Sequence, residues 1–313
     1  MSPLRIAYFG TPEFAVPGLR ALIASTHHVV ALVSQPDRPR GRGHKLQPTP
    51  TKLVAVAAGI AVLQPTRLKD DSLADALRAL SLDLAVVAAY GRIIPDRILE
   101  IPRLGMINIH ASLLPKYRGA APIHRAVING DKETGVTIMR VVSELDAGPA
   151  FAVERIPIGP DDTTPEVERA LAETGAKLAV RVVGELAEGS AVEVPQNHAE
   201  ATYAPKLERH EGAIDWSLPA NDIHNRVRGL QPWPLVSVTI DRVRCSIYRT
   251  SVSGETTTAP PGTVIAASNG VLAVAAGDGR VVRILEIQPE GKRVMSARDF
   301  LSGRRVQSGD RLP

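Results

Sequence analysis

An α/β domain with a doubly wound, mostly parallel sheet, followed by a small β-barrel domain, is the fold class that this 313-residue sequence predicts. Three observations predict it. Apolar strand patterns alternate with helix patterns over the first third of the chain. Residues 82–88 form a continuous apolar run, which is typical of a strand buried on both faces of a parallel sheet. From residue 206 onward, short β-branched segments alternate with Gly, Asp and Pro turns.

The first part of the chain alternates between the two kinds of element, in the order that a Rossmann-like domain requires. Strands are expected at residues 4–9, 29–34, 61–63, 82–88 and 105–110. Helices are expected at residues 13–25, 51–58, 72–80 and 164–186, and a β-rich run covers residues 134–141. In such domains ligands bind beyond the carboxyl ends of the strands. We therefore look for the site just after these strands.

The second part of the chain differs in its pattern of residues. Residues 188–205 are rich in small, polar and proline residues and predict a linker. A helix at 220–230 then precedes strands at 236–240, 245–250, 262–266, 271–275 and 281–285. Many short strands with regular turns fit a small barrel or sandwich, and of these we expect an OB-like barrel. The expected domains are therefore residues 1–187 and 206–313, joined by the linker 188–205.

Composition excludes several classes of protein. No apolar run approaches the roughly 20 residues of a membrane span, and the first ten residues lack the layout of a signal peptide. Cys245 is the only cysteine, which excludes a disulfide within the chain and argues against a cysteine-based metal site. Gly10-Thr-Pro12 follows a strand but is not a dinucleotide-binding fingerprint. We expect a cytoplasmic protein without a membrane, metal, nicotinamide or flavin.

Positive charge is unevenly distributed. Residues 206–313 carry 15 Lys/Arg against 11 Asp/Glu, whereas residues 1–205 carry 22 of each. The neutral first part still contains one basic segment between residues 37 and 45, with Arg38, Arg40, Arg42 and Lys45. A basic loop together with a basic second domain suggests a polyanionic partner. Charge alone favours the simpler interpretation, a solvated loop and ordinary surface charge, because net charge bears on solubility as much as on function.

The stretch from Gly105 to Pro115 carries the clearest chemical signal. Asn108 and His110 stand two residues apart on an expected strand, so their side chains point to the same side. An amide can donate to a developing oxyanion, and an imidazole can move a proton near neutral pH. Asp146, in a second turn, can orient that imidazole. A lone histidine is more often structural, but this combination indicates acyl transfer without a covalent nucleophile.

Several motifs together resemble the methionyl-tRNA formyltransferase family, one of the folate-dependent formyltransferases. The resemblance extends over nearly the whole chain. It rests on Phe9-Gly-Thr-Pro-Glu-Phe14, Gln35-Pro-Asp-Arg-Pro39, Ala89-Tyr-Gly91, Asn108-Ile-His-Ala-Ser-Leu-Leu-Pro115, Tyr117-Arg-Gly-Ala-Ala-Pro-Ile123, Gly135-Val-Thr-Ile-Met139, Leu145-Asp-Ala-Gly148, Ile214-Asp-Trp-Ser217 and Pro232-Trp-Pro234. The sequence departs from the family pattern at Ala147 and Pro149, where members often carry Thr and Asp.

The resemblance implies formyl transfer from 10-formyltetrahydrofolate to the amino group of methionyl-initiator tRNA by a monomer. It implies that the catalytic residues are Asn108, His110 and Asp146. Folate would bind at Ser112, Leu113, Leu114 and Pro115, with Ala89, Tyr90 and Gly91 lining the pteridine pocket. The acceptor end of the tRNA would meet Arg38, Arg40, Arg42 and Lys45 on a loop that orders on binding.

Two alternatives remain open at this point. A formyltransferase acting on an amino sugar or another small amine would share Asn108, His110 and Asp146, and the basic segment is the feature against it. A tRNA-binding module without catalysis is the second alternative, and the intact set of three residues argues against it. Whether His110 or a water near Asp146 takes the proton from the attacking amine is also open.

Overall fold

The computed structural model describes residues 3–40, 45–68 and 70–313. Its contacts divide the chain into two compact units. Unit 1 comprises Met1–Pro122, Glu133–Ile156 and Glu168–Ala204, and unit 2 comprises Ile123–Lys132, Pro157–Val167 and Pro205–Pro313. Segments from the middle of the chain therefore join the second unit. The expected domains, with boundaries near 187 and 206, remain a prediction.

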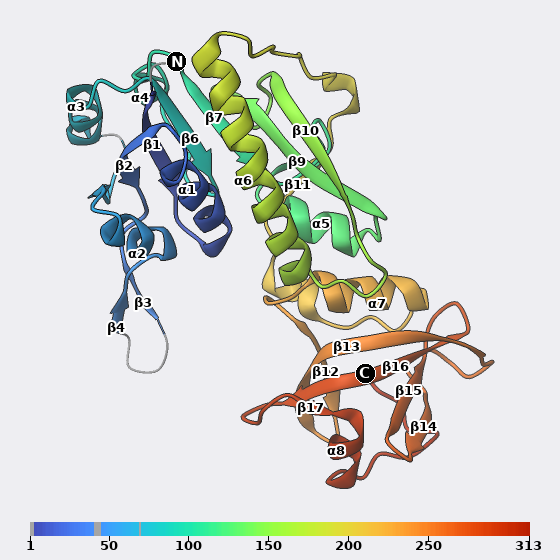
Figure 1. Cartoon of the computed structure of the whole chain (residues 1–313). Coiled ribbons are helices and arrows are strands. Elements are labelled where there is room, and N and C mark those ends of the chain that lie inside the picture. Colours follow the sequence, from blue (N-terminus) through green and yellow to red (C-terminus); the bar gives the residue numbers. More distant parts are fainter. Residues whose placement is uncertain (1–2, 41–44, 69) are drawn as a thin grey trace. The chain divides into compact units, whose positions relative to one another are not determined.

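Unit 1 is built on a seven-stranded sheet in the order β10-β9-β7-β6-β1-β2-β5 (Figure 1). Pairing is parallel from β5 through β2, β1 and β6 to β7, and β9 is antiparallel to β7. The strands are β1 (Arg5–Gly10), β2 (His28–Val33), β5 (Ala61–Leu63), β6 (Leu84–Ala88), β7 (Met106–His110), β9 (Glu133–Arg140) and β10 (Ala150–Pro157). The mostly parallel α/β sheet is as predicted.

Helices cover both faces of this sheet. Gly18 of α1 (Val16–Ile23) and Gly175 of α6 (Thr164–Glu188) both lie against Ile109 of β7. On the other face, α3 (Asp71–Ala79) and α4 (Asp96–Leu99) join a buried apolar cluster that includes Phe9, Val87 and Met106. The faces alternate along β7, so Asn108 and His110 point to the α3/α4 side.

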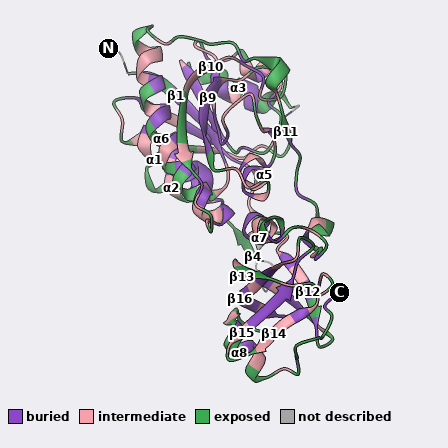
Figure 2. Ribbon diagram, turned by 90° about the vertical axis from the view of Figure 1, so that its right-hand side faces the viewer, coloured by how far each residue is buried: buried purple, intermediate pink, exposed green. Residues whose placement is uncertain are grey.

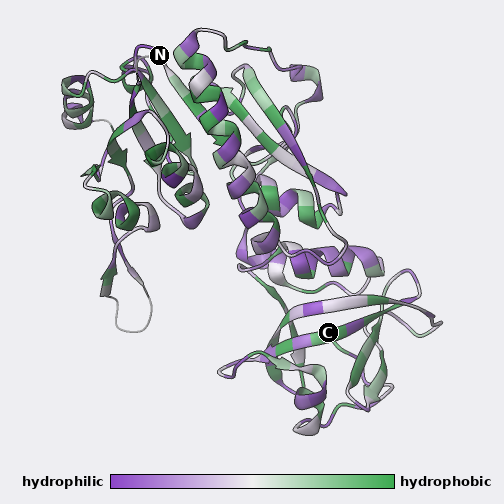
Figure 3. Cartoon of the chain, viewed as in Figure 1, coloured by the Kyte–Doolittle hydropathy of each residue, from purple (hydrophilic) through white to green (hydrophobic). Residues whose placement is uncertain are grey.

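Burial explains which strands the sequence revealed. All five residues of β6 are buried, and β9 is buried along most of its length (Figure 2). By contrast, β10 lies at the edge of the sheet and has no fully buried residue. An edge strand of mixed exposure lacks the apolar pattern that marks a central strand, and it was not predicted. Helix α6 alternates apolar and polar residues along its length, as expected of an amphipathic helix (Figure 3).

The expected linker at 188–205 is packed as part of unit 1 over most of its length. Val194 pairs with Ala150 in an antiparallel bridge, and β11 (Tyr203–Ala204) runs parallel to β8 (Arg118–Gly119). These short pairings join residues far apart in sequence, so local composition does not reveal them. Unit 1 also contains the helix α2 (Pro50–Ala57), whose N-cap is Thr49, and the strand pair β3 (Arg38–Arg40) and β4 (Lys45–Gln47).

Unit 2 is built mainly on an antiparallel sheet in the order β12-β13-β16-β15-β14, to which β17 adds beside β16. The strands are β12 (Val236–Ile240), β13 (Val243–Thr256), β14 (Val264–Ser268), β15 (Val271–Ala275), β16 (Arg280–Pro289) and β17 (Met295–Ser296). Helices α7 (Ala220–Gly229) and α8 (Ala297–Ser302) accompany it, together with most of α5 (Pro122–Ile128). The predicted β-rich second region is confirmed, and β13 and β16 extend beyond their expected ends.

The described residues also bear on membranes and metals. No helix in residues 3–40, 45–68 and 70–313 is long and apolar enough to cross a membrane. In the same part of the chain, no group of three or more His, Cys, Asp or Glu side chains is placed to hold a metal ion.

Candidate active site

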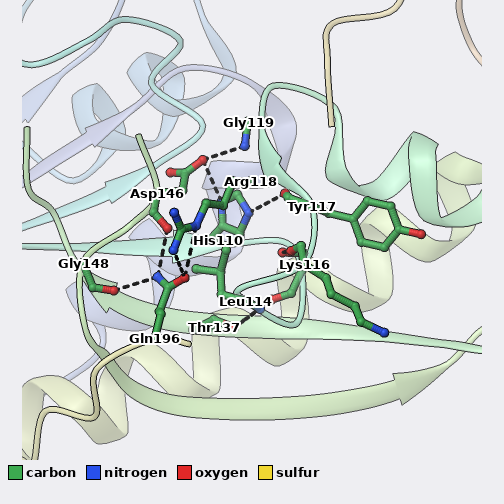
Figure 4. A network of polar contacts seen from close by, with 11 residues as sticks. His110, Leu114, Lys116, Tyr117, Arg118, Gly119, Thr137, Asp146, Gly148 and Gln196 are labelled. Atoms are coloured by element: carbon green, nitrogen blue, oxygen red, sulfur yellow. Dashed lines mark hydrogen bonds and ion pairs between the residues drawn. The ribbon is translucent and has the colours of Figure 1, made fainter. Parts of the chain in front are cut away.

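His110 is the last residue of β7, where the polypeptide leaves the central sheet. Its side chain is buried, and Nε2 lies 3.1 Å from the carbonyl oxygen of Tyr117 (Figure 4). A carbonyl oxygen can only accept, so this contact assigns a hydrogen to Nε2. The other ring nitrogen, Nδ1, is therefore the one at which a proton can be gained or lost.

Asn108 lies on the same face of β7 and is half-buried. The sheet register places it beside Val87 of β6 and Met139 of β9. Within the described part of the chain, no residue hydrogen-bonds to its side-chain amide. The amide is thus held by a rigid strand between apolar neighbours, with its N–H groups available to a ligand.

Asp146 comes to His110 from a separate turn. Its Oδ2 lies 3.7 Å from Nδ1 of His110 and accepts a hydrogen bond of 2.8 Å from the backbone N–H of Gly119. The backbone of Asp146 is in the left-handed region, at φ 47°. The structure therefore brings together the imidazole and the carboxylate that the sequence placed 36 positions apart. A carboxylate in this position can stabilise a positive charge on the imidazole.

The segment Ser112–Pro115 follows His110 directly and is tied to β9. Thr137 is the register partner of His110, and its hydroxyl donates to the carbonyl oxygen of Ser112 at 2.7 Å. The hydroxyl oxygen of Thr137 also accepts a hydrogen bond from the backbone N–H of Leu114 at 3.2 Å. The Ser112 hydroxyl donates to the carbonyl oxygen of Lys116 at 2.6 Å. Ser112 is buried and engaged, whereas Leu113, Leu114 and Pro115 are partly exposed.

The segment 89–91 follows β6, the strand adjacent to β7. Ala89 and Gly91 are exposed and have positive φ angles of 45° and 78°. The Tyr90 ring instead points into the core, with its centroid 5.5 Å from that of Phe9. Burial raises the pKa of the Tyr90 phenol, and its hydroxyl has no hydrogen-bond partner among the described residues. The backbone of this segment, rather than the tyrosine ring, is thus the part on the surface.

The basic segment begins as a strand pair anchored to unit 1. Arg38 is exposed and donates to Oε1 of Gln35 at 3.2 Å, while Nε2 of Gln35 donates to the carbonyl oxygen of Tyr90 at 2.9 Å. Hydrogen bonds from Gln64 and Lys52 lower the pKa of Asp37 at the base of the pair. We expected a loop that orders only on binding, but its two flanks are paired as strands.

The four basic residues of this segment are described to different extents. Arg40 and Lys45 are register partners in the pairing of β3 with β4. Arg42 lies outside the described residues. The structure therefore places the base of the basic segment next to the segment that follows β6, and leaves the prediction for Arg42 untested.

Two residues that the sequence did not single out take part in the site. Arg118 is buried, and it donates to Gln196, which in turn donates to the backbone around Asp146. Arg118 lies within one of the motifs used above, but nothing in its spacing indicated a role. Gln196 lies in the stretch that composition assigned to a linker, so no local signal was available for it.

Taken together, the fold brings an amide, an imidazole and a carboxylate to one place beyond a central strand, an arrangement suited to acyl-group transfer. Comparison with known families agrees. A formyl transferase model matches residues 4–183, and a model of the formyl transferase C-terminal domain matches residues 206–305. The chain belongs to the formyl transferase family.

Full-length relatives narrow the family further. The chain is 47% identical over 309 residues to the methionyl-tRNA formyltransferase of Methylococcus capsulatus, covering 99% of both chains. It is 45% identical over 309 residues to that of Moorella thermoacetica, again covering 99% of both. This chain is thus a member of the methionyl-tRNA formyltransferase group.

Solved structures share the fold at low sequence identity. An N-formyltransferase from Helicobacter canadensis, in complex with folinic acid and dTDP-3-aminofucose, matches with a TM-score of 0.69 at 17% identity, over 91% of this chain and 99% of that one. HypX from Aquifex aeolicus, in complex with tetrahydrofolic acid, matches with a TM-score of 0.67 at 17% identity, over 99% of this chain and 51% of that one. At this identity the likeness concerns the fold alone.

Proposed function

We propose that this protein transfers the formyl group of 10-formyltetrahydrofolate to the amino group of methionyl-initiator tRNA, as a monomer in the cytoplasm. The product is N-formylmethionyl-tRNA, which starts translation. One observation carries the catalytic part of the proposal: Nδ1 of His110 faces Oδ2 of Asp146 at 3.7 Å, on the same strand face as the available amide of Asn108. The identity to methionyl-tRNA formyltransferases supports the choice of acceptor.

The first step is direct attack by the amino nitrogen on the formyl carbon. A C–N bond forms, and the electron pair of the C=O bond moves onto the formyl oxygen. Asn108 donates a hydrogen bond to that oxygen, and the protonated His110 stabilises its negative charge. Removing one donor from such an oxyanion site typically lowers the rate by about 10²–10³-fold. Asp146 stabilises the charged imidazole during this step.

The second step breaks the bond between the formyl carbon and N10 of the folate. The oxyanion returns its electron pair to the C=O bond, and N10 leaves with a proton to give tetrahydrofolate. The attacking nitrogen loses one proton in exchange, so the proton count is balanced. Two routes for that proton fit the geometry: Nδ1 of His110, once the imidazolium has given its own proton to the leaving N10, and a water beside Asp146.

The segments that follow β7, β6 and β2 are proposed to bind the two substrates. The folate lies along Ser112, Leu113, Leu114 and Pro115, and the exposed backbone of Ala89 and Gly91 reads the edge of its ring. Tyr90 contributes its backbone, because its ring belongs to the core. Phosphates at the acceptor end of the tRNA meet the segment with Arg38, Arg40, Arg42 and Lys45, and basic residues of unit 2 hold the tRNA body.

A direct assay tests the choice of acceptor. Purified protein is incubated with 10-formyltetrahydrofolate and either methionyl-initiator tRNA or a nucleotide-linked amino sugar, the kind of ligand present in the Helicobacter canadensis structure. We expect formylation of the tRNA. We also expect Arg42→Ala to lower kcat/KM for the tRNA about tenfold. The slope of log binding constant against log salt concentration should become shallower by about one. If only the amino sugar is formylated, the formyl-transfer reaction stands, but methionyl-initiator tRNA is not the acceptor.

A further inference from the structure

Arg118 is the largest fully buried side chain among the described residues, with 1% of its surface exposed. Its Nη2 and Nε donate to Oε1 of Gln196 at 2.8 and 3.2 Å. The nearest carboxylate is that of Glu144, which is mostly exposed and lies 3.5 Å from Nη1. A buried guanidinium is retained only where its donors are well used. Here two of its nitrogens donate to one amide oxygen, and Nη2 also lies 3.3 Å from Nδ1 of His198.

Gln196 links Arg118 to the turn that carries Asp146. Because the arginine can only donate, it fixes the amide of Gln196 with its oxygen toward Arg118 and its nitrogen away from it. That nitrogen, Nε2, donates to the carbonyl oxygens of Asp146 at 2.9 Å and Gly148 at 2.7 Å. Both hydrogens of the amide are therefore directed at the backbone of the turn, as Figure 4 shows.

The contacts close into a ring. Gly119, the residue after Arg118 on β8, donates its backbone N–H to Oδ2 of Asp146 at 2.8 Å. The pair Arg118–Gly119 thus holds Asp146 twice, through the carboxylate directly and through the backbone by way of Gln196. Asp146 has a φ of 47°, a conformation that non-glycine residues hold only when their surroundings favour it.

We propose that Gln196, oriented by Arg118, is a positioning residue that keeps the carboxylate of Asp146 facing Nδ1 of His110. Gln196 acts through the backbone of Asp146, and no contact of its own with substrate is needed. The inference rests on the proposed role of Asp146 in formyl transfer. A displacement of about 1 Å at a reacting group can lower a rate by about 10²-fold, so loss of this anchor should be visible in kcat.

The test is Gln196→Met, which keeps the approximate length of the side chain and removes all of its hydrogen bonds. We expect kcat for formyl transfer to fall about 10–100-fold, while KM for either substrate changes less than about threefold. In an Asp146→Ala background the same substitution should have no further effect, because the group it positions is already gone. Loss of kcat in equal proportion in both backgrounds would overturn the proposal.

The chain offers a matched control three residues away. Glu193 anchors the same segment through an ion pair with Arg140 on β9, and it forms no hydrogen bond or ion pair with the described residues 144–148. Glu193→Gln should leave kcat unchanged. If it lowers kcat as much as Gln196→Met does, docking of the whole segment is responsible, and the specific role of Gln196 is wrong.

A second variant covers the case in which Gln196→Met does not fold. Arg118→Lys keeps the buried charge but loses the two-donor grip on Oε1 of Gln196. It should give a smaller loss of kcat that also vanishes in the Asp146→Ala background. The wild type reports separately on the proposed function: failure to formylate methionyl-tRNA rejects that function. The same series, run with whichever amine is formylated, still decides the role of Gln196.

Discussion

His110 and Asp146 face each other, but the protein places them by different means. His110 ends a central strand that has paired neighbours on both sides. Asp146 lies in a turn, and its two polar anchors come from residues 27 and 50 positions away in sequence. The imidazole is thus positioned by backbone geometry, and the carboxylate by individual polar contacts between distant segments.

The two ways of placing a side chain should differ in their response to substitution. Central strands open only with global unfolding, whereas turns held by a few hydrogen bonds open at lower free energy. Substitutions around His110 should therefore change stability and activity together. Substitutions around the Asp146 turn should change activity more than stability. Substitutions at His110 and Asp146 test this contrast, and one at Glu168 tests stability alone.

His110→Ala should have the largest effect. It removes the imidazole while leaving β7 paired, so kcat should fall at least about 10³-fold, with tRNA binding retained. Single-turnover formylation and a separate tRNA-binding measurement check this. His28→Ala is the control, because His28 is an exposed histidine in the same sheet. An active His110→Ala enzyme would remove the basis of the proposed mechanism.

Asp146→Asn should have the next largest effect, a loss of about 10²-fold in kcat through the missing charge. Asparagine tolerates the left-handed backbone at this position, so the turn should keep its shape and the melting temperature should change little. Asp146→Ala adds backbone strain, and it should also lower stability, by about 1 kcal/mol. Equal stability of the two variants would show that the turn does not depend on its left-handed residue.

Glu168→Gln should have the smallest effect, and on stability only. Burial raises the pKa of the Glu168 carboxyl, and the nearby Glu13 carboxylate raises it further. As pH rises above about 4.3, the unfolded chain loses this proton first, so the native state loses stability until the folded-state carboxyl also ionises. The glutamine avoids this loss.

Calorimetry at two pH values measures the effect. At pH 7.5 Glu168→Gln should melt about 1–2 °C above the wild type, and at pH 4 the difference should shrink. Glu173→Gln, at an exposed position of the same helix, should show neither change. A variant that melts below the wild type at pH 7.5 would assign the Glu168 carboxylate a stabilising partner instead.

The placement of Asn108 and His110 was predictable because the apolar pattern of a buried strand is visible in consecutive residues. The apolar run of β6 and the alternation in β7 place Asn108 and His110 on one face, next to the segment after β6. The edge strand β10 and the pairing of β8 with β11 were missed, because their residues are partly exposed or their pairing is very short. Tyr90 was assigned to the pocket, and its ring instead packs against Phe9.

By itself, the sequence determined the class of fold, the face that carries Asn108 and His110, and the family to which the chain belongs. These depend on local periodicity and on motifs, both of which are written in consecutive residues. Only the tertiary structure decided how Asp146 is oriented, because Arg118, Gly119 and Gln196 reach it from separate segments. Hydrogen bonds between residues far apart in sequence have no local pattern, so the stretch containing Gln196 was taken for a linker.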